Sequence, residues 1–267
     1  MTILNSYQHR INTLLLSYIH KQKSPPPLQE ALAYCIGGKH IRALIIYTLG
    51  HDLNIPTTTL DSIAISVELM HSFTLIHDDL PCMDNDDFRR NKPSCHRKFN
   101  EAIAVLAGDA LQALSYEALS QTPGCTMEMV QTLSKATGAK GLCGGQTLDC
   151  LNHAQSADDY LEIISMKTAE LIATCFKLTA LIARLDNQKV QQLTLAGKHL
   201  GIAFQLQDDI QDHDQDHHSI LQFISLDTAQ QWIHHHFQET LHNITTSLKN
   251  HPSFYDLFTF IKNRELA

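Results

Sequence analysis

Apolar residues recur every three or four positions along most of the chain, and this spacing places them on one face of a helix. The clearest run follows Pro56, where Ile63, Val67, Met70 and Thr74 advance by four, three and four residues. Strand-like alternation is absent, and only eight prolines and eleven glycines interrupt the pattern. The sequence therefore predicts an all-α protein, with further helices over residues 6–22, 28–36, 41–49, 102–120, 127–136, 158–184, 189–211 and 228–249.

The composition is that of a folded globular protein, since 43% of the 267 residues are hydrophobic and 18% are charged. Twenty Lys and Arg residues stand against 28 Asp and Glu residues, which gives a formal net charge of -8. Sequence-independent binding to nucleic acid needs a basic surface, so this balance argues against it. No segment rich in Gly, Ser or Pro divides the chain, and we expect one domain over residues 1–267.

The seven cysteines are an odd number and include no C-x-x-C pair, so neither a disulfide framework nor a zinc site is indicated. The first ten residues lack the basic start and apolar run of a signal peptide. No continuous apolar run approaches the roughly 18 residues of a membrane-spanning helix. We therefore expect a cytoplasmic protein with reduced thiols and no membrane span.

A first acidic cluster contains Asp78, Asp79 and Asp84. Because Pro81 would break a helix, Asp78 and Asp79 should end one helix and Asp84 should return from a loop. Carboxylates that converge at a helix C-terminus, where the helix dipole is negative, repel one another unless cations lie among them. Hard oxygen ligands favour Mg²⁺, which commonly binds carboxylates together with substrate phosphates. The alternative interpretation is a solvated acidic turn.

A second acidic cluster lies in an otherwise apolar helical segment and consists of Asp208, Asp209 and Asp212. Gly201, Gln205, Asp208 and Asp212 share one helical face. Unpaired buried charge is costly, so these carboxylates need a partner. Gly197, four residues before Gly201, would let a neighbouring helix approach closely. Two such clusters facing one cavity are the arrangement expected for Mg²⁺ ions that grip a diphosphate.

A third segment supplies positive charge. Gly37 and Gly38 precede a helix whose start carries Lys39 and Arg42, three residues apart. Helix N-terminal amides together with Lys and Arg side chains form an anion-binding site. A glycine C-cap followed by surface cations is the simpler alternative. His71 lies seven residues before Asp78, on the same helical face, and gains significance only from these neighbours.

Six segments of the chain resemble the trans-polyprenyl (isoprenyl) diphosphate synthase family and occur in the family's order over residues 37–212. They read G-G-K-H-I-R, V-E-L-M-H-S-F-T-L-I-H-D-D-L-P-C-M-D-N-D-D-F-R-R, L-A-G-D-A-L, C-G-G-Q-T-L-D, K-T-A-E-L and G-I-A-F-Q-L-Q-D-D-I-Q-D. The resemblance implies an all-α, single-domain isoprenoid synthase bundle around a deep central cavity, working as a homodimer.

The resemblance also implies a Mg²⁺-dependent trans-prenyltransferase. Such an enzyme condenses isopentenyl diphosphate head to tail with dimethylallyl or geranyl diphosphate and gives farnesyl diphosphate. Three Mg²⁺ ions would bind with the allylic diphosphate. The implied magnesium ligands are Asp78, Asp79, Asp84, Asp208, Asp209 and Asp212.

The remaining site residues follow from the same resemblance. Arg89 matches the arginine that clamps the allylic diphosphate. The positions that line the allylic carbon and stabilise its cation are Lys167, Thr168 and Gln205, and Lys167 also meets the diphosphate. The implied isopentenyl diphosphate site consists of Lys39, Arg42, His71 and Arg90. Phe73 and Thr74, one turn before Asp78, match positions where bulk limits the product, so Phe73 predicts a fifteen-carbon chain.

The sequence departs from the family pattern at two places. His40 and Ala43 stand where the pattern G-G-K-R-x-R-P has an arginine and a proline. After Asp212, a short run of Asp and His residues ending at His218 replaces a longer loop, whose lysine contacts the allylic diphosphate in relatives. We interpret the run as a polar loop, with a transition-metal site as the alternative.

Other functions stay open. The product could be geranyl or geranylgeranyl diphosphate, or the chain could be a non-catalytic or regulatory paralogue, which the short loop favours and two intact aspartate motifs oppose. A class I terpene cyclase is disfavoured because Lys39, Arg42 and His71 would have no isopentenyl diphosphate to bind. A helical interaction module would not require six family segments.

Overall fold

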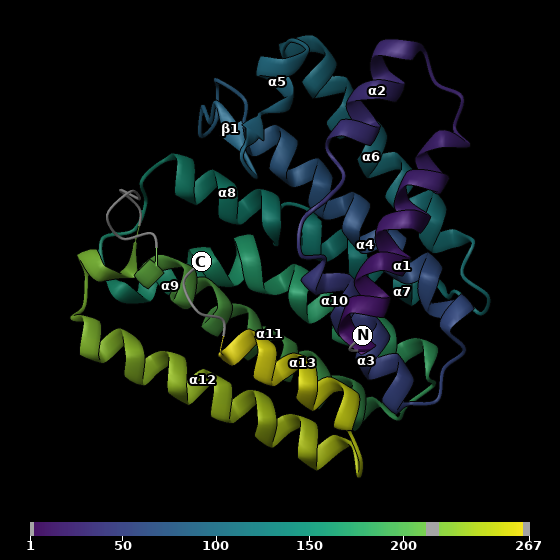
Figure 1. Ribbon diagram of the computed structural model, residues 1–267. Coiled ribbons are helices and arrows are strands. Elements are labelled where there is room, and N and C mark those ends of the chain that lie inside the picture. Colours follow the sequence, from purple (N-terminus) through teal and green to yellow (C-terminus); the bar gives the residue numbers. More distant parts are fainter. Residues whose placement is uncertain (1–2, 212–218, 264–267) are drawn as a thin grey trace. The chain divides into compact units, whose positions relative to one another are not determined.

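The computed structural model describes residues 3–211 and 219–263, and within these ranges the fold is helical apart from one short hairpin (Figure 1). The helices are α1 (Ile3–His20), α2 (Pro26–Tyr34), α3 (Ile41–Asp52), α4 (Thr57–Asp78), α5 (Cys95–Lys98), α6 (Glu101–Ser120), α7 (Met127–Thr137), α8 (Leu142–Cys150), α9 (Ala157–Ile164), η1 (Ser165–Ala169), α10 (Glu170–Ile182), α11 (Asn187–Gln211), η2 (Ile220–Gln222), α12 (Leu226–Ser247) and α13 (Pro252–Lys262). The hairpin pairs β1 (Phe88–Arg89) with β2 (Lys92–Pro93). The all-α prediction is confirmed.

The chain forms two compact units. The first contains Met1–Tyr47 and Ile55–Cys125, and the second contains Thr48–Asn54 and Thr126–Ala267. Helix α3 contributes to both. The expectations of one domain over residues 1–267 and of a deep central cavity stay predictions.

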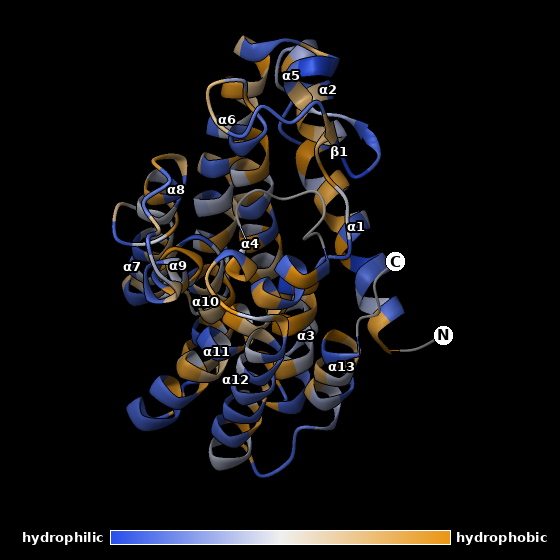
Figure 2. Cartoon of the chain, turned by 90° about the vertical axis from the view of Figure 1, so that its left-hand side faces the viewer, coloured by the Kyte–Doolittle hydropathy of each residue, from blue (hydrophilic) through white to orange (hydrophobic). Residues whose placement is uncertain are grey.

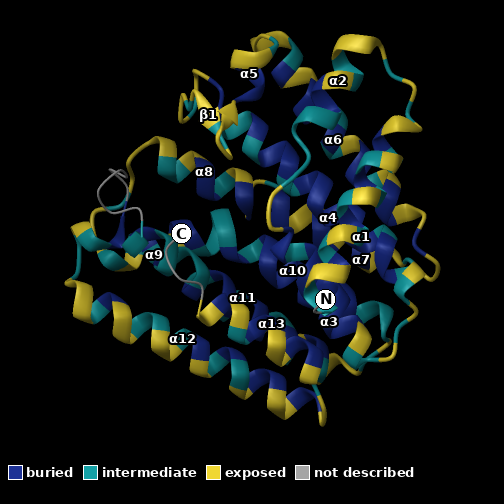
Figure 3. Ribbon diagram, in the orientation of Figure 1, coloured by how far each residue is buried: buried dark blue, intermediate teal, exposed yellow. Residues whose placement is uncertain are grey.

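The first unit is built on α4, which is buried along most of its length (Figure 3) and packs against α6. Ser115 of α6 donates a hydrogen bond to the Ser66 carbonyl of α4 at 2.7 Å. A side chain at Gly108 would collide with the His77 ring, because its Cβ would lie 2.1 Å from Nε2. The two helices therefore approach closely at the end of α4 that carries Asp78.

Helices α4 and α6 are long and apolar enough to cross a membrane by length and composition alone. Of the most apolar 18-residue window, 72% is buried inside the protein in α4 and 44% in α6. A core helix meets the same test, and Asp61 and Glu68 interrupt the apolar run of α4. The absence of a membrane span stays a prediction.

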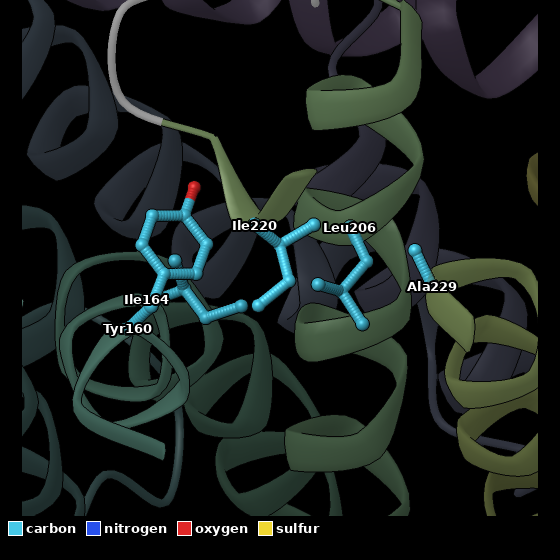
Figure 4. Close-up of a cluster of buried hydrophobic side chains, with 5 residues drawn as sticks. All are labelled: Tyr160, Ile164, Leu206, Ile220 and Ala229. Carbon is cyan, nitrogen blue, oxygen red and sulfur yellow. The ribbon is translucent and has the colours of Figure 1, made fainter. Parts of the chain in front are cut away.

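The second unit packs α10, α11 and α12 side by side (Figure 1). A Cβ at Gly201 would lie 2.5 Å from the Ala169 Cα, and one at Gly197 would lie 2.5 Å from the Phe176 ring. This confirms that the two glycines admit a close neighbouring helix. Figure 4 shows an apolar cluster beside α11, which joins segments far apart in the sequence. Its buried members are Tyr160, Ile164, Leu206, Ile220 and Ala229.

Two histidines meet between α11 and α12, where His199 Nδ1 lies 2.8 Å from His236 Nδ1. Burial, followed by the influence of His199 and His235, lowers the pKa of His236 to about 4. Burial also lowers the pKa of His199. His236 is thus neutral in the folded protein at a pH at which the unfolded chain is protonated.

We expect this pair to make the protein less stable in mild acid. Below the ordinary histidine pKa of about 6.5 the unfolded state binds the extra proton, so the free energy of unfolding falls as the pH drops from about 6.5 towards 4. For His236 the loss is about 1 kcal/mol between pH 7 and pH 5.5. Thermal unfolding at both pH values measures it. His236→Gln should reduce the pH dependence, the exposed His234→Gln should not, and equal slopes for all three proteins would contradict the assignment.

Candidate active site

The first acidic cluster lies at the C-terminus of α4. The helix ends at Asp78, and Asp79 caps it through a backbone hydrogen bond to the Leu75 carbonyl at 3.1 Å. The following loop turns back, so that the Asp84 amide donates to the Asp78 carbonyl at 2.9 Å. This confirms that Asp78 and Asp79 end a helix and that Asp84 returns from a loop. Asp84 is exposed and Asp79 is buried.

The hairpin beside this cluster carries Arg89 and lies in a hydrophilic stretch of the chain (Figure 2). The Arg89 guanidinium donates to Asp79 Oδ1 from Nε at 2.9 Å and to Asp86 Oδ2 from Nη2 at 2.8 Å. Burial raises the pKa of Asp79 above its ordinary value, although Arg89 opposes this. Asp79 therefore orients Arg89, a role that motif matching did not assign to it.

The glycine loop before α3 lies against Arg90. Arg90 Nη1 donates to the Cys35 carbonyl at 3.4 Å, and a Cβ at Gly38 would lie 2.9 Å from the guanidinium carbon. Gly37 and Gly38 adopt φ angles of 146° and 104°, which side chains rarely allow. The backbone of the loop can therefore pass directly over the arginine, while Lys39 stays exposed.

His71 lies among the cations of the first unit. Burial, followed by the charges of Arg42, Arg90 and Arg89, lowers the pKa of His71 well below its ordinary value. Its ring is therefore neutral at physiological pH. The structure thus brings together His71, Arg42 and Arg90, three of the four residues that the resemblance implies for isopentenyl diphosphate. The guanidinium groups of Arg42 and Arg90 suit an anionic ligand.

One turn before Asp78, Phe73 is 8% exposed. Its ring meets the His77 ring edge to face, with 4.9 Å between the ring centroids. The Thr74 hydroxyl donates to the His71 carbonyl of its own helix at 2.8 Å. The Thr74 hydroxyl is therefore engaged within its own helix, and Phe73 provides the bulky side chain at this level of α4.

In the second unit, Lys167 and Thr168 lie in η1, a single turn of π-helix. The sequence predicted one helix over residues 158–184, because hydrophobic spacing does not reveal a one-residue widening. π-turns are rare and often mark functional sites. Lys167 Nζ binds Asp149 Oδ2 of α8 at 2.5 Å. A Cβ at Gly145 would lie 2.5 Å from the Lys167 amide, so α8 lies directly against the widened turn.

A hydrogen-bond relay joins η1 to α11. The Thr168 hydroxyl donates to Gln205 Oε1 at 3.0 Å, and Gln205 Nε2 donates to Asp209 Oδ1 at 3.1 Å. The other oxygen of Asp209 accepts the Ile220 amide at 3.1 Å. Asp209 is 2% exposed, whereas its neighbour Asp208 is only partly buried. The buried aspartate therefore fixes the structure around the relay.

Asp149 is a site residue that the sequence reasoning missed. It belongs to the segment C-G-G-Q-T-L-D, which was quoted for the resemblance without a role. A cavity of about 210 Å³ borders it, lined also by His153, Tyr160 and Ser219. Asp212 and the run that ends at His218 lie outside the described residues, so the predictions made for them stay predictions.

The residues predicted to hold Mg²⁺ suit that ion chemically. The predicted ligands are all carboxylates, the hard oxygen donors that this ion prefers. Within residues 3–211 and 219–263, no group of three His, Cys, Asp or Glu side chains forms a ready metal site. The ligand chemistry of these carboxylates fits Mg²⁺.

The comparisons identify the family. Residues 25–234 match the polyprenyl synthetase family. The farnesyl diphosphate synthase of Haemophilus influenzae is 40% identical over 224 residues, which cover 80% of this chain and 76% of the relative. A geranyltransferase structure from Legionella pneumophila matches with a TM-score of 0.88 and 33% identity, covering 98% of this chain and 96% of the other. An FPP/GFPP synthase structure from Zymomonas mobilis also has a TM-score of 0.88, at 28% identity over 97% of this chain and 98% of the other. This chain belongs to the polyprenyl synthetase family.

Proposed function

We propose that the protein is a trans-prenyltransferase that joins isopentenyl diphosphate to dimethylallyl or geranyl diphosphate and releases farnesyl diphosphate. Relatives named farnesyl diphosphate synthase support the product. The observation that carries the proposal is the gathering of Arg42, Arg90 and His71 in the first unit. A second diphosphate substrate needs such a site, whereas a cyclase has only one diphosphate to bind.

We propose that the acidic residues hold Mg²⁺ together with the allylic diphosphate, with Asp78, Asp84 and Asp208 as the principal ligands. When bound, the ions supply positive charge that offsets the charge developing on the departing diphosphate. Arg89 adds a guanidinium held in place by Asp79 and Asp86. Because Arg89 is already oriented, little reorganisation is needed as charge develops.

The residues of the second unit would stabilise the allylic cation. Lys167, fixed by Asp149, binds the leaving diphosphate. The relay from Thr168 to Gln205 and Asp209 holds the hydroxyl and amide dipoles in one orientation, where their oxygens can face the cationic carbon. The proton lost from the isopentenyl unit passes to the released diphosphate, so no side chain is assigned as a base.

Product length depends on Phe73 in this proposal. Phe73→Ala removes a ring that is 8% exposed at one turn below Asp78, so products longer than fifteen carbons are expected. Chromatography of the dephosphorylated products against chain-length standards measures this. Phe260→Ala, the same truncation at an exposed position of α13, should leave the products unchanged. An unaltered distribution for Phe73→Ala would show that chain length is limited elsewhere.

We also propose that the protein acts as a cytoplasmic homodimer. Val105 and Leu106 of α6 are 40% and 54% exposed, on a helix of which 44% of the most apolar window is buried. Two neighbouring exposed apolar side chains suit a second copy of the same surface. Within residues 3–211 and 219–263 the seven cysteines form no disulfide, which agrees with a reducing compartment.

The direct test is turnover by the purified protein with Mg²⁺, isopentenyl diphosphate and geranyl diphosphate. One diphosphate released for each fifteen-carbon product is the expected result. Binding of geranyl diphosphate without any elongation would instead favour the non-catalytic paralogue.

A further inference from the structure

A buried carboxylate lies directly under the glycine loop. Glu68 of α4 accepts hydrogen bonds from His40 Nδ1 at 2.8 Å and from the Ala43 amide at 3.0 Å. The side chains of His40 and Glu68 are 2% and 4% exposed. Burial alone would raise the pKa of Glu68, but the bonds from His40 and Ala43 lower it below its ordinary value. Glu68 is therefore an ionised group with two defined donors.

These two donors lie on either side of the start of α3. His40 immediately precedes the helix, and Ala43 lies in its first turn, where amides have no partner within the helix. Lys39 adjoins His40, and Arg42 adjoins Ala43. Glu68 therefore holds the His40 side chain next to Lys39 and the Ala43 backbone next to Arg42.

The backbone immediately before α3 is strained. His40 has a φ of 51°, in the left-handed region that favours glycine, and it follows Gly37 and Gly38 at 146° and 104°. Such conformations persist only where surrounding contacts impose them. The other ring nitrogen of His40, Nε2, is buried with no hydrogen-bond partner in the described part of the chain. The ring is thus held by Glu68.

Both departures from the family pattern in this segment meet at Glu68. The pattern has arginine in place of His40 and proline in place of Ala43. Proline has no amide hydrogen to donate, and arginine has several donors where histidine has one facing the carboxylate. The donor that His40 lacks is supplied by the Ala43 amide, so the two departures compensate for each other.

We propose that Glu68, His40 and the Ala43 amide form a carboxylate clamp that positions Lys39 and Arg42 to bind the diphosphate of isopentenyl diphosphate. Glu68, His40 and Ala43 are positioning residues, since none of them touches the substrate. The clamp rests on the proposed function and adds to it the element that sets the affinity for one of the two substrates.

The first test is Glu68→Gln, which keeps the shape of the side chain and removes its charge. We expect KM for isopentenyl diphosphate to rise about 10- to 100-fold, while kcat and KM for geranyl diphosphate change less than about threefold. Glu30→Gln, the same change at an exposed position of the first unit, should leave all three constants unchanged. An equal rise of both KM values would overturn the clamp, because a general structural defect would affect both substrates.

The second test is a double-mutant cycle. Ala43→Pro alone removes one donor and should raise KM for isopentenyl diphosphate about tenfold. Adding His40→Arg should restore it to within about threefold of wild type, because arginine can donate twice to Glu68. Failure of the arginine to rescue the proline variant would contradict the compensation. The proline lies in the first helical turn, where it fits, so the cycle stays informative if Glu68→Gln does not fold.

Failure of the clamp can be distinguished from failure of the proposed function. If the wild-type protein does not elongate geranyl diphosphate, the proposed function fails. Calorimetric binding of isopentenyl diphosphate alone then tests the clamp. Weaker binding by Ala43→Pro, restored by His40→Arg, supports it, and equal binding by all three proteins overturns it.

Discussion

Replacing Asp208 by asparagine is expected to lower kcat by about a thousandfold while the unfolding temperature stays within about 2 °C of wild type. Asp208 is only partly buried on α11, and in the proposed site its charge binds Mg²⁺. Asparagine preserves the size of the side chain and removes the charge. Steady-state turnover at several Mg²⁺ concentrations, with thermal unfolding of the same samples, measures both quantities.

Asp209→Asn is the matched control, because the neighbouring carboxylate of Asp209 is engaged in hydrogen bonds within the protein. Asp209 accepts hydrogen bonds from the Ile220 amide and from Gln205, and it is 2% exposed. Its replacement should lower the unfolding temperature by several degrees, because a buried charge-assisted hydrogen bond is weakened. Equal losses of activity and stability in the two variants would contradict the division of roles between these aspartates.

Lys167→Met should lower kcat about a hundredfold or more, because a fixed positive charge is lost where the diphosphate leaves. Asp149→Asn should have a smaller effect, about tenfold, because Lys167 keeps its charge but loses its 2.5 Å partner. The double variant should be no worse than Lys167→Met alone, since Asp149 acts only through Lys167. Single-turnover rates with saturating substrates isolate this step.

Independent, additive losses in the double variant would contradict this coupling. Lys198→Met provides a comparison, since Lys198 also pairs with a carboxylate, Glu170, at 3.0 Å on the same unit. It is expected to leave turnover within about threefold of wild type, because exposed ion pairs contribute little.

Local sequence patterns correctly predicted the long helices. They also predicted that one helix ends at Asp78 and Asp79 and that Asp84 returns from a loop. They did not predict α8 and α13, because each depends on a distant partner. Gly144 and Gly145 weaken α8 as an isolated helix, yet Gly145 is what lets it approach Lys167. The first amides of α13, those of Ser253 and Phe254, bind the carboxylate of Asp52 at 3.1 and 2.9 Å. A cap some two hundred residues away leaves no local signal.

The same limit applies to the candidate site. Family motifs named Lys167, Gln205 and Arg89, but not Asp149, which orients Lys167, or the relay that fixes Gln205. They named Asp79 as a metal ligand and not as the partner of Arg89. Glu68 belongs to the family segment that begins V-E-L-M-H, but the resemblance assigned it no role, because only the fold brings it next to His40. Spacing along one helix reveals a shared face, whereas a partner on another helix becomes visible only in three dimensions.

The most direct measurement is the product of the wild-type protein, incubated with Mg²⁺, isopentenyl diphosphate and either dimethylallyl or geranyl diphosphate. We expect farnesyl diphosphate from both allylic substrates, one diphosphate released at each condensation, and no product when the Mg²⁺ is chelated. Mg²⁺-dependent binding of the allylic diphosphate without elongation would contradict it, and would identify a paralogue that has kept the binding site and lost the chemistry.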